Sequence, residues 1–150
     1  MSAPAHPFEL GTDGPATIVA AIDGSVTSLR AAAYAGGLAR RQGSRLLAIY
    51  VQGVGGLGST SAEAVLAQRE SGEATARELR DLVEQARGRG VRVDFTTRVG
   101  DPYTEITRFA EEVRADALVV GVSERRGHRL IGSLAVRLVR AGRWPVTVVP

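Results

Sequence analysis

The sequence has no cysteine and no lysine, and only 5% of its 150 residues are aromatic. The lack of cysteine excludes a disulfide framework and a thiolate metal site, and it makes the cytoplasm the expected location. All 19 basic residues are therefore arginine, which explains an isoelectric point of about 10.1 at a formal net charge of only +3. Scattered arginines without an aromatic stacking surface indicate a solvated surface and no nucleic-acid partner.

Long hydrophobic runs are also missing. No apolar run reaches the roughly 18 residues that a transmembrane helix needs, so we expect no membrane association. Residues 1–16, MSAPAHPFELGTDGPA, have neither a basic residue nor an apolar core, which excludes a secretory signal and predicts a flexible N-terminal tail. Residues 17–150 are numerous enough to bury a core, and we expect them to form a single domain.

Apolar runs and helical periodicities alternate along the rest of the chain. We expect strands at residues 17–23, 45–51, 91–99, 117–121 and 145–149. Helices are expected at residues 29–43, 61–87 and 103–115, and a fourth is marked by Ile131, Leu134, Ala135 and Leu138. This alternation predicts an α/β fold, a flavodoxin-like open twisted sheet of five parallel strands in the order 3-2-1-4-5 with helices on both faces.

The topology also predicts where a ligand binds. Ligands of open α/β sheets lie beyond the carboxyl ends of the strands, at the point where the strand order reverses. In the order 3-2-1-4-5 that point lies between the first and fourth strands. Asp23 follows the first apolar run and Gly121 ends the fourth, so we expect both residues at one site.

The stretch GVSERRGHRLIGS, residues 121–133, has the composition of an anion-binding loop. Glycine lets backbone amides approach a phosphate closely, and Gly132-Ser133 opens the fourth helix, whose free N–H groups favour negative charge. Ser133 would cap that helix or donate its hydroxyl to a phosphate. Arg126, His128 and Arg129 would add attraction. Any connection from a strand to a helix also favours glycine and a serine cap, so the loop alone leaves both interpretations open.

Four segments together point to a family. IVAAIDGSVTSLRAAAYA, LLAIYV, GDPYTEITRFAEEVRADALVVG and LIGSLAVRLVRAGRWPVTVV occur in this order. With them the chain resembles the universal stress protein family over residues 17–150. The resemblance implies the flavodoxin-like fold, a homodimer and, as in many members, binding of ATP.

The family's ATP-binding motif is Gly, two residues, Gly, nine residues, Gly, then Ser or Thr. Gly121, Gly132 and Ser133 match it, whereas Glu124 stands in place of the second glycine and the loop is two residues shorter. Gly127 is the candidate to replace the missing glycine. By resemblance, Asp23 faces the adenosine part of the nucleotide, and Mg²⁺ arrives with the phosphates. The full set of predicted nucleotide-binding residues is Ala21, Asp23, Val51, Gly121, Arg126, Gly127, His128, Arg129, Gly132, Ser133 and Leu134, with Val51 against adenine and Ala21 on the floor.

Other classes of protein fit less well. A receiver domain of two-component signalling needs a lysine near the fifth strand, and the chain has none. A flavodoxin needs aromatic residues around its flavin, and the hydroxyl groups of DGSVTS are better suited to capping the first helix. The G-x-G-x-x-G of residues 53–58 lacks the acidic residue that should end a following strand. No nucleophile elbow or cluster of metal ligands is present, so we expect no catalytic residue and no enzyme.

The leading hypothesis is a regulatory module of the stress response that binds ATP or a related adenine nucleotide. The alternative is a nucleotide-free dimeric module that binds protein partners, and the altered loop favours it. Either form is expected to be a homodimer. The last strand, PVTVV, is short and apolar, and an edge strand offers its free backbone groups to a second copy. The sequence identifies no protein partner.

Overall fold

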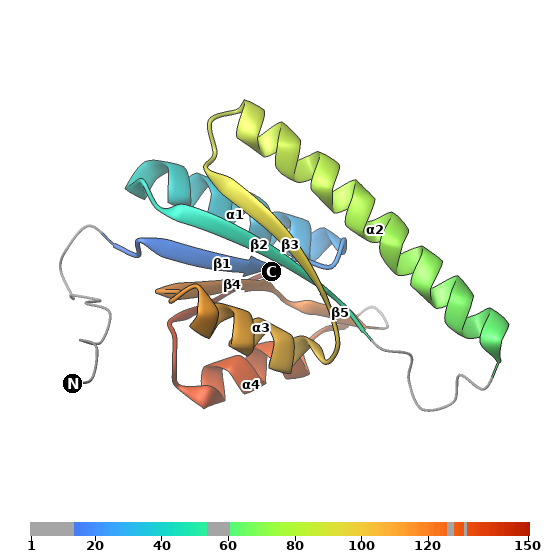
Figure 1. Ribbon diagram of the computed structural model, residues 1–150. Coiled ribbons are helices and arrows are strands. Elements are labelled where there is room, and N and C mark those ends of the chain that lie inside the picture. Colours follow the sequence, from blue (N-terminus) through green and yellow to red (C-terminus); the bar gives the residue numbers. More distant parts are fainter. Residues whose placement is uncertain (1–13, 54–60, 126–127, 131) are drawn as a thin grey trace, which may run out of the picture.

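Five parallel strands form the central sheet of the computed structural model (Figure 1), which describes residues 14–53, 61–125, 128–130 and 132–150. The strand order is β3-β2-β1-β4-β7, so the predicted order 3-2-1-4-5 is confirmed. The bounds are β1 Thr17–Ala21, β2 Arg45–Gln52, β3 Val93–Val99, β4 Ala117–Gly121 and β7 Val146–Val149.

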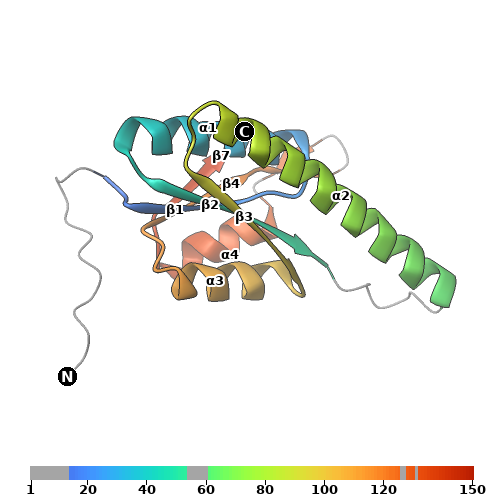
Figure 2. The same cartoon turned by 45° about the horizontal axis from the view of Figure 1, so that its top comes forward.

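Four helices cover the sheet, two on each face (Figure 2): α1 Val26–Gln42, α2 Ala62–Gly88, α3 Pro102–Glu112 and α4 Ser133–Ala141. The alternation of side chains along β1 explains the two layers. Ile18 and Ala20 pack in the core beneath α1 and α2, whereas Val19 packs in the core beneath α3 and α4. Both faces of β1 are therefore buried, as expected for a central strand of a parallel sheet.

Short polar side chains and glycines set the ends of the helices. Ser25 caps α1, where its hydroxyl accepts a hydrogen bond from the N–H of Ser28. Gly43 ends α1 in the left-handed conformation at a φ of 71°, which glycine adopts without strain. Asp101 caps α3 and accepts from the N–H of Thr104 at 2.9 Å. The predicted role of DGSVTS as a helix cap is confirmed, and α1 begins at Val26, three residues before the predicted start.

One element differs from the prediction. In the stretch expected to be a loop without strands, β5 Ser123–Arg125 pairs antiparallel with β6 His128–Leu130. The expectation of a plain loop was wrong because strands of three residues are too short to show an alternating apolar pattern. A small β-ribbon therefore separates β4 from α4.

The amino-terminal side of β1 is fixed by buried polar contacts. The Oδ2 atom of Asp116, just before β4, accepts hydrogen bonds from the N–H groups of Ala16 and Thr17, both at 2.9 Å. The hydroxyl of Ser44 donates to the carbonyl oxygen of Pro15. Pro15 and Ala16 of the predicted tail are thus hydrogen-bonded to residues at the starts of β2 and β4, and residues 1–13 lie outside the described residues.

Helix α2 extends well beyond the carboxyl edge of the sheet (Figures 1 and 2). Residues 61–71 are all exposed, and the helix buries only Gly72, Leu79 and Val83. It meets the sheet at Gly72, where an added Cβ would lie 2.2 Å from Cδ of Gln52 at the end of β2. Within the described ranges, no helix is long and apolar enough to cross a membrane.

Candidate functional site

The strand order reverses at β1, which pairs with β2 on one side and β4 on the other. Beyond the carboxyl end of β1, the chain turns to α1 on one face. Beyond β4, it continues through the ribbon of β5 and β6 to α4 on the other face. The predicted site residues therefore belong to segments that meet at one edge of the sheet. This is the position at which open α/β sheets bind ligands.

Three predicted residues share one face of the sheet. Ala21 at the end of β1, Val51 near the end of β2 and Leu134 in the first turn of α4 are partly buried against the core beneath α3 and α4. The structure thus places these three on the same side of the sheet, against one apolar core. Apolar side chains of this kind suit the face of a nucleobase.

Asp23 lies in the loop between β1 and α1, and its side chain is held in place locally. Its Oδ1 atom accepts a hydrogen bond from the N–H of Ser25 at 2.9 Å, and its own N–H donates to Oγ of Ser28 at 3.2 Å. Partial burial raises the pKa of Asp23, but hydrogen bonds from Ser25 and Ser28 offset this effect and leave the pKa below its ordinary value. The carboxylate is therefore ionised at neutral pH and has lone pairs left for a hydroxyl donor.

The lowered pKa predicts a pH dependence of stability. Because the folded state favours ionised Asp23, this residue stabilises the fold above its unfolded pKa of about 4, and the contribution is lost as the pH falls through the lower folded pKa. Asp23→Asn keeps the oxygen acceptor but removes the charge. Urea unfolding between pH 6 and pH 2 should show wild type more stable than the variant at pH 6, with the difference shrinking below about pH 4. A difference that is independent of pH would contradict this role for the charge.

Gly121 lies against the first turn of α1. A Cβ built on Gly121 would stand 2.6 Å from the carbonyl carbon of Thr27 and 2.7 Å from the backbone nitrogen of Ser28. The hydroxyl of Thr27 donates to the carbonyl oxygen of Val122 at 2.6 Å, which joins α1 to the end of β4. Close packing of backbone on backbone therefore requires glycine here. Sequence reasoning missed the role of Thr27, because its partner is 95 residues away.

Gly132 is the N-cap residue of α4, and Ser133 is the first residue of the helix. Of the two roles predicted for Ser133, the cap is not observed, because the N-cap position is occupied by Gly132, which has no side chain to make a cap hydrogen bond. A Cβ on Gly132 would lie 2.5 Å from Cβ of Ser123 in β5, so glycine permits the ribbon to approach the helix. Ser133 is exposed. Among the described residues, none donates a side-chain cap to the first turn of α4, whose backbone N–H groups have no partner within the helix.

The basic residues of the loop are placed only in part. Arg126 and Gly127 lie outside the described residues. His128 and Arg129 belong to the backbone of β6, and their side chains are likewise outside what the structure describes. The register pairs Glu124 with Arg129. The acidic residue at the altered motif position is therefore opposite a basic one along the ribbon.

The described ranges contain no group of three or more His, Asp or Glu side chains that could hold a metal ion.

Comparison with known proteins gives one consistent result. The model of the Universal stress protein family matches residues 16–150. Among curated proteins, a universal stress protein from Methanocaldococcus jannaschii is 32% identical over 139 residues, which is 88% of this chain and 80% of the relative.

Solved structures agree with this match. The universal stress protein UspA from Lactobacillus plantarum superposes with a TM-score of 0.74 at 21% identity, over 89% of this chain and 97% of the other. A universal stress protein in complex with cAMP has a TM-score of 0.66 at 28% identity, over 91% of this chain and 97% of the other. The likeness extends over nearly the whole of each chain.

Proposed function

Because the chain belongs to the universal stress protein family, we propose that it binds ATP or a related adenine nucleotide at the carboxyl edge of β1 and β4. Binding there would make it a regulatory module of the stress response that works in the cytoplasm. The observation that carries the proposal is the first turn of α4, which has no side-chain cap and begins at the strand-order reversal. The cAMP complex of a similar protein supports an adenine nucleotide as the ligand.

Each part of the nucleotide has a partner in this arrangement. The base would lie on the apolar side chains of Ala21 and Val51, and the ribose hydroxyls would donate to the ionised carboxylate of Asp23. The phosphates would accept hydrogen bonds from the backbone of Gly132 and Ser133, where the dipole of α4 is favourable. Mg²⁺, if bound, would be held by the phosphates, because these residues offer no ligand cluster of their own.

We propose no catalytic role for this site. Two of the described hydroxyl groups near it are already engaged: Thr27 donates to the carbonyl of Val122, and Ser28 donates to the carbonyl of Ser25. Neither is paired with a general base, which nucleophilic catalysis requires. Ligand occupancy, and not turnover, would then be the signal that the protein transmits.

Thermal unfolding tests whether the nucleotide binds. ATP with Mg²⁺ at about one hundred times its dissociation constant should raise the free energy of unfolding by about 2.7 kcal/mol, since a ligand that binds only the folded state stabilises it. Differential scanning calorimetry of nucleotide-stripped protein measures this directly. An unchanged melting temperature at millimolar ATP would contradict the proposal.

A second candidate is a nucleotide-free module that binds other proteins. Two observations favour it. The packing of Gly121 against α1 and of Gly132 against Ser123 explains both matching glycines without a ligand. In addition, Glu124 replaces the motif's second glycine. The absence of any stabilisation by ATP would select this candidate.

We also propose that the protein forms a homodimer through β7, whether or not it binds a nucleotide. This strand pairs with β4 on one side and is an edge of the sheet. All four of its residues, Val146–Val149, are only half-buried although three are valines. A second copy added along this edge would satisfy free backbone groups and cover apolar surface.

A charge at β7 tests this interface. Val148→Arg should convert a particle of two chains into one of a single chain, because the dimer would have to bury an unpaired guanidinium. Size-exclusion chromatography with light scattering gives the mass. The matched control is Val99→Arg on the other edge strand, β3, where Val99 is 64% exposed. A mass that stays at two chains in the Val148 variant would exclude this interface.

A further inference from the structure

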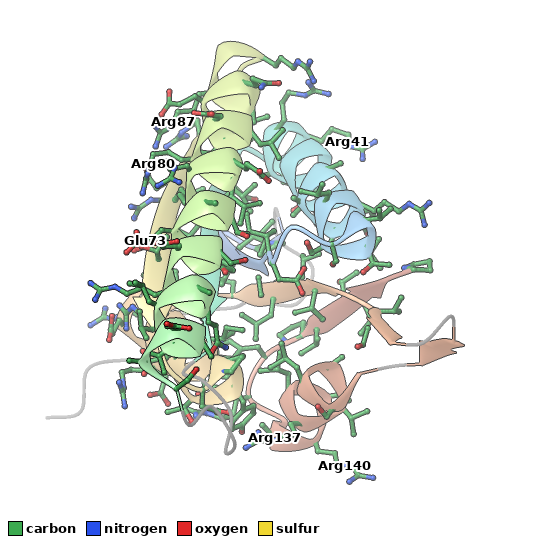
Figure 3. The ribbon with its side chains drawn as sticks, turned by 90° about the vertical axis from the view of Figure 1, so that its right-hand side faces the viewer. Arg41, Glu73, Arg80, Arg87, Arg137 and Arg140 are labelled. Atoms are coloured by element: carbon green, nitrogen blue, oxygen red, sulfur yellow. The ribbon has the colours of Figure 1, made fainter. Side chains whose placement is uncertain are left out.

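A cavity of about 320 Å³ lies at the amino-terminal edge of the sheet, the edge opposite the proposed nucleotide site. Its walls come from the start of β2, the last turn of α2 and the entry to β3: Arg45, Arg87, Val91, Arg92, Val93 and Asp94. Figure 3 shows Arg87 toward the carboxyl end of α2, far from Arg137 and Arg140 on α4. Three arginines from separate segments therefore converge on one opening.

Two of these arginines are fixed by one carboxylate. Nε and Nη2 of Arg45 both lie near Oδ2 of Asp94, at 3.3 and 3.0 Å. Nη2 of Arg87 lies 3.3 Å from Oδ1 of Asp94. Nε of Arg87 donates to the carbonyl oxygen of Val93 at 2.7 Å. Asp94 thus orients two guanidinium groups around the cavity. Such preorganisation lowers the entropy cost of binding an anion.

The side chain of the third arginine is not engaged. Arg92 is exposed, its carbonyl oxygen accepts a hydrogen bond from the N–H of Leu46 at 3.0 Å, and its guanidinium makes no hydrogen bond or ion pair to another described residue. The lining carries three arginines and one aspartate, Asp94, so its net charge is +2. Glu84 forms an ion pair with Arg87 and lowers the local net charge to +1. A bound anion would balance this excess.

We propose that this cavity binds a dianionic phosphate group, either free or carried by a small molecule. Each guanidinium has five N–H donors in a planar fork that matches two phosphate oxygens, and Arg92 has all five available. Arg45 keeps further donors beyond those directed at Asp94. Val91 and Val93 give the cavity an apolar side that suits the organic part of a phosphomonoester.

This site is separate from the proposed nucleotide site. Arg45 begins β2 and Gln52 ends it, and a strand of eight residues spans about 26 Å. One phosphate group cannot reach both edges. The two sites can therefore be tested independently.

The experiment is a titration followed by ¹H–¹⁵N NMR on the full chain at constant ionic strength. Inorganic phosphate is added to wild type, Arg92→Gln and the control Arg140→Gln, which removes the same charge from α4. We expect amide shifts at residues 91–94 in wild type and in the control. Arg92→Gln should weaken this binding about ten-fold, the usual effect of losing a charge-assisted hydrogen bond. Because the side chain of Arg92 has no described partner, its replacement should leave the fold intact.

Glycerol 3-phosphate in a parallel titration distinguishes the two sources of phosphate. Tighter binding than inorganic phosphate supports a phosphomonoester, and equal binding supports the free ion; shifts at residues 91–94 are required in both cases. The proposal is overturned if neither probe shifts the amide signals of residues 91–94 at about 20 mM, a concentration high enough to detect even a weak site. It is also overturned if Arg92→Gln and Arg140→Gln bind equally, or if the shifts occur only around residues 132–134.

Discussion

Replacing Gly121 by alanine is expected to lower the free energy of unfolding by about 2 kcal/mol, the usual effect of inserting a methyl group where no space exists. The new Cβ would lie 2.6 Å from the carbonyl carbon of Thr27 and 2.7 Å from its oxygen. These are backbone atoms in the first turn of α1, and they cannot move aside as the tip of a side chain can. Either β4 or α1 must shift.

The same shift should weaken nucleotide binding. Ser28, whose backbone nitrogen lies in this contact, accepts the hydrogen bond from the N–H of Asp23. A displaced α1 would therefore move the carboxylate proposed to hold the ribose. We expect a loss of about ten-fold in ATP affinity, equal to one lost charge-assisted hydrogen bond.

Gly88→Ala is the matched control for this prediction. Gly88 ends α2, and a Cβ built there meets nothing within 4 Å. Alanine has the higher helix propensity, so this change should be neutral or slightly stabilising. Urea unfolding and ATP titration of both variants complete the test. If Gly121→Ala behaves like Gly88→Ala, the close contact between β4 and α1 is not present in solution.

Leu138→Ala is expected to have the largest effect on stability, about 3 kcal/mol, which corresponds to a fall of roughly 10 °C in melting temperature. Leu138 in α4 is completely buried, and it packs in the core with Val19 of β1 and Leu118 of β4. Truncation would leave a cavity beneath the helix whose first turn is proposed to bind phosphate.

The neighbouring residue provides the control. Val139 is 54% exposed, so Val139→Ala removes surface methyl groups and should change stability by less than about 0.5 kcal/mol. Thermal unfolding of the two variants measures the contrast. Equal destabilisation by both would mean that the helix packs with a different face toward the sheet.

The sheet order was predictable because it depends on simple patterns. Continuous apolar runs marked β1, β2 and β4 as buried strands, and the intervening helices required right-handed parallel crossovers. Helix ends were predictable where one residue decides them, as Gly43 does at a φ of 71°. These signals are local, so a single sequence contains them.

The candidate site was predictable only in outline. The topology placed Asp23 and Gly121 at one edge, but the reason for each glycine lay in contacts made across the fold. Gly132 meets Ser123 through a ribbon whose three-residue strands have no recognisable period. The cavity between Arg45, Arg92 and Asp94 was missed for the same reason, because it joins segments about fifty residues apart.

The central claim is that the first turn of α4 binds the phosphates of an adenine nucleotide. Isothermal titration calorimetry with ATP and Mg²⁺ on nucleotide-stripped wild type, Ser133→Ala and Ser133→Asp tests it most directly. Ser133 is exposed and makes no cap bond, so both variants should fold, and an acidic residue in the first turn even favours the helix.

The predicted result is micromolar binding by wild type, a small loss in Ser133→Ala and a loss of at least about ten-fold in Ser133→Asp, where the carboxylate repels the phosphates. Equal affinity in all three proteins would place the phosphates elsewhere. No heat with any of them, at millimolar ATP, would contradict nucleotide binding by this chain.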